Sequence, residues 1–129
     1  MNILVQQPSY KYIAEEFLKI YYNLYDSDFR QLHNLYHSSP YITYAEEEFT
    51  NFPDLYRRII SHYKINKFSH SSINFTCQPV NDRGIVINVL GRLSVNNNIA
   101  QTGSFSETII LVKNDQNRYH IHNSILKVS

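Results

Sequence analysis

The chain has 129 residues and a mass of 15.3 kDa, which is enough for one domain with a core and too little for two. Hydrophobic residues make up 43% of it, which excludes a disordered chain. Twelve Lys and Arg against eleven Asp and Glu leave a net charge of +1, so whole-domain charge makes no case for binding nucleic acid or a membrane surface. We expect a single domain over residues 1–129 that binds neither directly.

Cysteine usage and hydropathy bear on the compartment. Cys77 is the only cysteine, which excludes an internal disulfide and a zinc site made of cysteines alone. No stretch approaches the roughly 20 apolar residues that span a bilayer, and the N-terminus lacks the basic region and apolar core of a secretory signal. These features fit a protein of a reducing compartment.

Three helices are expected in the first half of the chain. After the turn signal Pro8-Ser9, with Ser9 as N-cap, an amphipathic run extends to about Asp26. A shorter helix follows Asp28 and ends at Ser38-Ser39-Pro40. A third opens at Phe52-Pro53-Asp54, with Asn51 as a candidate cap.

Strands dominate the rest. A short strand is expected at Tyr41 to Ala45, and four longer ones are separated by polar turns: Lys67–Cys77, Gly84–Val95, Ser104–Lys113 and Arg118–Lys127. Helices first and strands later, without βαβ alternation, indicate an α+β fold with a mainly antiparallel sheet.

Two strands carry nearly continuous apolar runs, at 85–90 and 108–112. A strand with one face in water should alternate, so these runs suggest that both sheet faces are covered. Three helices can cover only one face, and we expect a second subunit on the other, with Ile87, Val89, Ile110 and Val112 in the dimer interface. The alternative is a sheet curled around its own core.

Catalytic and metal sites find little support. His120 and His122 would share a strand face, and His33 and His37 a helix face, but no third and fourth metal ligands follow at recognisable spacing. Glu107 is the one acid inside a strand, and Tyr21, Tyr22 or Tyr44 could face it in a small acid–base enzyme such as an isomerase or dehydratase. We expect no cofactor and no metal, and treat the enzyme as the alternative function.

The whole of residues 8–128 resembles the nuclear transport factor 2 family. The first helix carries a Phe-x-x-x-Tyr-Tyr pattern at Phe17–Tyr22, and Gly84–Leu93 ends in the Gly-x-Leu of the family's central strand. Further similar segments, in the family's order, are Leu32–Tyr36, Phe105–Leu111 and His122–Lys127. The resemblance implies a cone in which a curved sheet packs on three N-terminal helices, dimerisation through the outer sheet face and, in the transport branches, no enzymatic activity.

Three branches of the family compete. The import carrier binds Ran in its GDP form through a Trp-Glu pair and turn acids, where this chain has Tyr44-Ala45 and Asn96-Asn97-Asn98, so Ran binding is doubtful unless Glu46–Glu48 compensates. That acidic run is either a solvated loop or edge strand, or a surface for a basic partner. The other branches are the small subunit of messenger-RNA export and the N-terminal domain of stress-granule scaffolds and deubiquitinase cofactors.

The scaffold branch implies a groove for Phe-Gly motifs between the first helix and the sheet. The positions carried over are Ile13, Phe17, Leu35 and Leu126, all of them apolar. Ordinary core packing would equally explain them. From the resemblance we expect a dimeric Phe-Gly adaptor, as a homodimer or heterodimer, in nucleocytoplasmic transport or messenger-ribonucleoprotein handling. It would act in cytoplasm and nucleus, including the nuclear pore.

Overall fold

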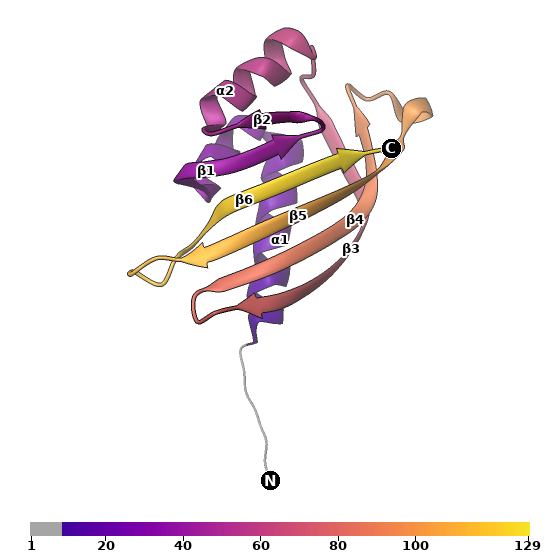
Figure 1. Cartoon of the computed structure of the whole chain (residues 1–129). Coiled ribbons are helices and arrows are strands. Elements are labelled where there is room, and N and C mark those ends of the chain that lie inside the picture. The colour runs from indigo at the N-terminus through magenta and orange to yellow at the C-terminus, as the bar shows by residue number, and fades with distance from the viewer. Residues whose placement is uncertain (1–8) are drawn as a thin grey trace.

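The computed structural model describes residues 9–129, so the turn expected at Pro8 lies outside the described residues. The longest helix, α1, spans Tyr10–Ser27, and the Ser9 hydroxyl caps it by accepting a hydrogen bond from the Tyr12 backbone N–H at 3.3 Å. Figure 1 shows α1 lying behind the sheet, across its inner face. The capping residue is as the sequence predicts, whereas the expected apolar stripe is only partly right, because Phe17 and Tyr21 are buried but Ile20 is 53% exposed.

Two shorter helical segments complete the helical layer. Residues Phe29–Leu35 form a 3-10 helix, η1, and α2 spans Phe52–Arg57, continued by the π-helical turn η2 at Arg58–His62. Asn51 caps α2 by accepting a hydrogen bond from the Asp54 backbone N–H at 2.9 Å. A single 3-10 turn, η3 at Ile99–Gln101, lies between two strands.

The six strands form one curved sheet in the order β2-β1-β6-β5-β4-β3 (Figure 1). Their bounds are β1 Tyr36–Tyr44, β2 Glu47–Phe49, β3 Phe68–Val80, β4 Gly84–Val95, β5 Gly103–Lys113 and β6 Tyr119–Val128. Only β1 and β6 pair in parallel. The α+β class and the mainly antiparallel, curved sheet packed on helices are confirmed.

Two strand boundaries were wrong, and both errors involve a proline. The first strand begins at Tyr36 instead of Tyr41, and it passes through Pro40 because its register with β6 shifts between Tyr36 and Tyr41. The strand β3 continues past Cys77 through Pro79, which an edge strand tolerates because its outer N–H groups need no sheet partner.

The core lies between the inner sheet face and the helices. Directly paired residues share a face, and the inner pairs Ile85–Leu111 and Ile87–Ile109 are all at most 1% exposed. From α1, a row of aromatic side chains, Phe17, Tyr21, Tyr22 and Tyr25, meets this face. The tyrosine-rich composition is therefore used mainly to fill the space between helix and sheet.

Candidate functional site

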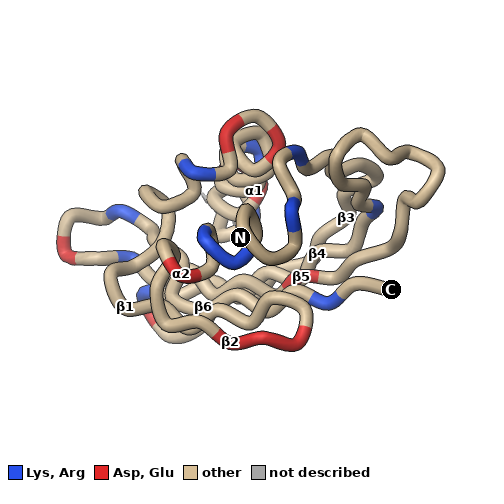
Figure 2. Tube along the Cα trace, turned by 90° about the horizontal axis from the view of Figure 1, so that it is seen from above, with Lys and Arg blue, Asp and Glu red and all other residues tan. Residues whose placement is uncertain are grey.

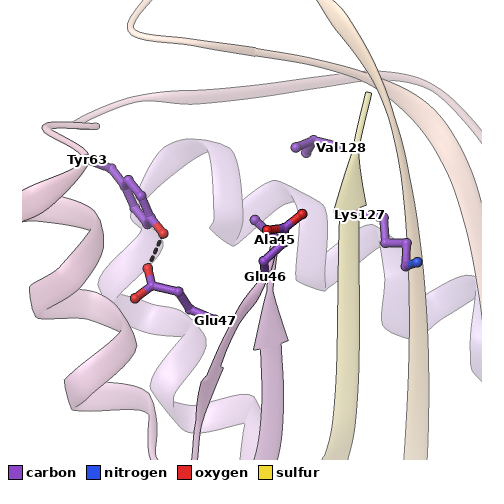
Figure 3. Close-up of a pocket in the computed structure, with 6 residues that line it drawn as sticks. All are labelled: Ala45, Glu46, Glu47, Tyr63, Lys127 and Val128. Carbon is purple, nitrogen blue, oxygen red and sulfur yellow. Dashed lines mark hydrogen bonds between the residues drawn. The ribbon is translucent and has the colours of Figure 1, made fainter.

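A hollow opens where β1 ends. The backbone turns at Ala45, whose φ of 59° is in the left-handed region, and leads into the acidic run before and within β2. The hollow has a volume of about 620 Å³ and is lined by Ala45, Glu46, Glu47, Tyr63, Lys127 and Val128 (Figure 3). Three elements far apart in the chain therefore meet around one concave surface.

The carboxylate of Glu47 is held as an anion at the edge of this hollow. The Arg58 Nε donates to both of its oxygens, at 3.1 and 2.9 Å, and the Tyr63 hydroxyl donates to Oε1. The hydrogen bonds from Arg58 and then from Tyr63 lower the pKa of Glu47. Glu47 therefore stays ionised at neutral pH, and its charge is paired with that of Arg58.

The neighbouring acids extend the negative surface. Glu46 and Glu48 are exposed on either side of Glu47, and Figure 2 shows the acidic stretch at the start of β2 on the rim of the molecule. Lys127 enters the hollow from β6, away from the Glu47–Tyr63 pair (Figure 3). Such a surface suits a basic or hydrogen-bond-donating group of a partner.

A second glutamate, Glu107, lies in the interior on the inner face of β5. It is 3% exposed, and the hydroxyls of Tyr21 and Tyr22 each donate to one of its oxygens at 2.8 Å. Burial raises the pKa of Glu107, while the two tyrosine hydrogen bonds act in the opposite direction. The same burial, followed by the charge of Glu107, raises the pKa of Tyr21 and of Tyr22.

The interior around Glu107 is packed closed. The His70 side chain, 1% exposed, lies between the Tyr22 and Tyr25 rings and the Phe105 ring, and its Nδ1 is 2.6 Å from Asp26 Oδ1. None of the five hollows described for residues 9–129 is lined by Glu107 or His70. An acid beside two tyrosines, the arrangement expected of an enzyme, is thus present, but none of the hollows described for residues 9–129 reaches the acid.

The four positions carried over for Phe-Gly binding do not converge on a described hollow. Ile13 and Leu35 are half-buried, whereas Phe17 is 8% and Leu126 2% exposed and both belong to the core. None of the four lines any of the five hollows. A ligand would meet Ile13 and Leu35 first, and the groove remains a prediction.

Half of the expected dimer interface is wrong. Ile87 and Val89 are 0% exposed and face the helices, so they cannot touch a second subunit. The register explains the error, because Ile110 pairs with Val86 and Val112 with Gly84, which places Ile87 and Val89 on the opposite face. Ile110 and Val112 do lie half-buried on the outer face, and pairing through that face stays a prediction.

The histidines combine differently from their sequence pairs. His37 and His122, on the neighbouring strands β1 and β6, lie with their ring centroids 4.0 Å apart and their planes tilted by 32°. Among residues 9–129, no cluster of three or more His, Cys, Asp or Glu side chains is arranged to hold a metal ion. In the same range, no helix has the length and apolar character needed to cross a membrane.

Sequence reasoning missed the partners of Glu47. It noted the acidic run at 46–48, but Arg58 and Tyr63 were not singled out. Their contact with Glu47 depends on how α2 and η2 pack beside β2, and no local sequence pattern predicts such a contact.

Comparisons with known proteins extend over nearly the whole chain. The family model "Nuclear transport factor 2 (NTF2) domain" matches residues 13–128. Nuclear transport factor 2 of Saccharomyces cerevisiae is 25% identical over 118 residues, covering 91% of this chain and 92% of that protein.

Solved structures agree in fold. Nuclear transport factor 2 from Cryptosporidium parvum superposes with a TM-score of 0.83 at 19% identity, covering 98% of this chain and all of that one. Yeast Ubp3-associated protein Bre5 superposes with a TM-score of 0.74 at 19% identity, covering 95% of this chain and 98% of that one. A protein from Novosphingobium aromaticivorans that is assigned as a scytalone dehydratase superposes with a TM-score of 0.67 at 15% sequence identity. The match covers 90% of this chain and 81% of that one, so proteins assigned as enzymes share the fold. The family-model match, over almost all of the described residues, shows that the chain belongs to the nuclear transport factor 2 domain family.

Proposed function

We propose that the protein is a dimeric, non-enzymatic adaptor of the nuclear transport factor type, which binds partner proteins that carry Phe-Gly motifs. It would act in nucleocytoplasmic transport or messenger-ribonucleoprotein handling, in cytoplasm and nucleus and at the nuclear pore. A nuclear transport factor-like function is supported by homologues named nuclear transport factor 2, one of which matches over 91% of this chain. No cofactor is required.

The observation that carries the proposal is a group of exposed or half-buried apolar side chains on the outer face of the sheet, which lie among polar ones such as Asn88 and Thr108. Leu90 is 55% and Ile125 44% exposed there, and the half-buried Val86, Ile110 and Val112 lie on the same face. The helices cover only the inner face (Figure 1). Exposed apolar side chains grouped on a sheet face are typical of a protein–protein interface, and a second related domain, identical or not, would cover them.

The closed interior argues against catalysis. Both oxygens of Glu107 already accept hydrogen bonds, and its side chain has almost no contact with solvent. A general acid or base needs a free position within hydrogen-bond reach of a substrate. The small isomerase or dehydratase considered as the alternative function is therefore less well supported than the adaptor.

Phe-Gly binding is proposed beside α1 and η1. Ile13 offers half-buried apolar surface one turn before Phe17, and Leu35 ends η1, which packs against α1. Burying one Phe ring in such a place contributes about 1.5–3 kcal/mol, which gives weak, reversible binding. A dimer presents two such sites, so a partner with repeated motifs gains from avidity.

The test is a titration of the folded protein with a labelled Phe-Gly peptide, followed by fluorescence anisotropy beside an Ala-Gly control peptide. We expect Ile13→Asp to abolish binding, whereas Tyr12→Asp, at a neighbouring position that is 60% exposed, should preserve it. Phe17→Ala should also abolish binding but costs about 3–5 kcal/mol of stability as a core deletion, so its fold must be checked by circular dichroism. Equal binding of both peptides, or none up to millimolar peptide, would contradict the proposal.

A second candidate function is cargo binding at the hollow beside β1. The observation that favours it is the anionic Glu47, with Glu46, on a concave surface of about 620 Å³ directly after Tyr44-Ala45, where the import carrier has its Ran-binding pair. Calorimetry with Ran-GDP and with an arginine-rich peptide tests it. Binding that is lost in a Glu46→Gln, Glu47→Gln double variant supports a basic cargo; no binding of either ligand removes this candidate.

A further inference from the structure

A separate hollow lies at the end of the sheet where several chain reversals meet. The start of β1, the β3–β4 turn and the β5–β6 turn come together there (Figure 1). The hollow has a volume of about 440 Å³, and its polar lining includes His37, His120, His122, Arg83, Lys113 and Asp115. None of these six residues belongs to the Phe-Gly site or to the hollow beside β1, but Val112, which belongs to the proposed outer-face interface, also lines this hollow.

Positive groups dominate this lining. Arg83 donates from Nε to the Lys113 carbonyl at 2.9 Å and pairs with Asp115 at 3.2 Å. That ion pair is weak, since the Asp115 side chain is fully exposed and water and salt screen it. Lys113 has no ion-pair partner among residues 9–129. The lining therefore contains one weakly held carboxylate together with a guanidinium, an ammonium and three imidazoles.

The three imidazoles line one hollow, and the charge of the other two opposes the charging of His122. The centroids of the His37 and His122 rings are 4.0 Å apart, and the Ser39 N–H donates to His37 Nδ1 at 3.1 Å, which leaves the Nε2 of neutral His37 as an N–H donor. Burial, then His37 and His120, lower the pKa of His122. A bound dianion would reverse this repulsion, and its binding would be coupled to uptake of protons by the cluster.

We propose that this hollow binds a phosphoryl group on a protein partner, with Arg83 and Lys113 as permanent cations and the three histidines as donors. Arginine and lysine are the usual ligands of a phosphoryl dianion, and its three oxygens can accept hydrogen bonds from several of the donors that line the hollow. A protein is favoured over nucleic acid because the chain's net charge is only +1 and a tract of phosphates requires a longer basic surface. The site would bind a phosphorylated residue of a partner protein, and this binding would not depend on Phe-Gly motifs.

Calorimetry with a short phosphoserine peptide, beside the same peptide with serine, tests the proposal. We expect only the phosphopeptide to bind, and its binding to take up protons, seen as a heat that differs between two buffers of different ionisation enthalpy. Inorganic sulfate, which keeps its charge between pH 6 and 8, should bind more tightly as pH falls, by at most about tenfold per pH unit for each proton taken up.

Variants locate the site. Lys113→Gln and Arg83→Gln should each lower the affinity for the phosphopeptide by about tenfold. His122→Gln should abolish most of the pH dependence, and the matched controls Lys64→Gln and His62→Gln, at exposed positions outside the hollow, should change nothing. Circular dichroism verifies that each variant is folded.

Three results would overturn the proposal. The first is equal affinity for the phosphorylated and unphosphorylated peptides. The second is phosphopeptide binding that survives in both Lys113→Gln and Arg83→Gln. The third is tighter binding of a short single-stranded RNA than of the phosphopeptide, lost in the same variants, which would assign the hollow to nucleic acid instead.

Discussion

Two glutamates that accept hydrogen bonds from tyrosines behave in opposite ways in this molecule. Glu107 lies in the interior, where burial raises its pKa, and Glu47 lies beside an open hollow, where Arg58 and Tyr63 lower its pKa. Both are carboxylates that accept hydrogen bonds from tyrosine hydroxyls, and their surroundings decide whether the pKa rises or falls. The interior acid is part of the packing, whereas the acid at the hollow is partly exposed and its oxygens are bound by Arg58 and Tyr63.

The largest expected effect is on stability when the interior acid is removed. Glu107→Ala leaves the Tyr21 and Tyr22 hydroxyls without acceptors in the core and creates a cavity. We expect a loss of about 2–4 kcal/mol in the free energy of unfolding, measured by urea titration. A variant as stable as the wild type would show that the tyrosine–glutamate cluster does not support the core.

The second-largest expected effect is on how the free energy of unfolding depends on pH, which differs between the two acids. The folded-state pKa of Glu107 is raised, so its contribution to stability is fully present below its unfolded-state pKa and is lost as pH rises through the folded-state value. Glu107→Gln should remove this decline while keeping most of the packing. The check is the difference in urea midpoint between wild type and Glu107→Gln across pH 4 to 8. The wild type should lose its advantage toward high pH, and a constant difference would contradict the assignment.

The smallest effect is expected from Glu47. Its depressed pKa contributes stability above the unfolded-state value that is lost as pH falls through the folded-state value, but the group is exposed and salt screens its ion pair. Glu47→Gln should leave the thermal midpoint unchanged at physiological salt. A drop of several degrees in a melting curve would mean that this acid, too, is structural.

The fold could largely be predicted from the sequence because its strongest signals are local. Turn residues on both sides set the bounds of Gly84–Val95, and serine and asparagine caps mark where α1 and α2 begin. The errors came where tertiary context overrides a local rule. Pro40 and Pro79 read as breaks, but a register shift and an edge position accommodate them within strands.

The sites were less predictable because they depend on pairing between distant segments. In a nearly continuous apolar run, periodicity cannot tell which alternate residues face the helices, and only the β4–β5 register assigns Ile87 inward and Ile110 outward. The contact between the His37 and His122 rings likewise depends on the parallel pairing of β1 with β6. Glu107 was singled out correctly as the strand acid beside tyrosines, but its burial required the structure.

The mass of the folded protein in solution tests the proposed pairing through the outer sheet face most directly. If that face is covered by a second copy, light scattering should give about 30 kDa, twice the chain mass of 15.3 kDa. Ile110→Asp on that face should give a folded monomer, and the matched control Ile60→Asp, at a position that is 42% exposed on η2, should remain a dimer. A wild-type species of about 15 kDa at micromolar concentration would contradict the homodimer, and a dimer that survives Ile110→Asp would contradict pairing through this face.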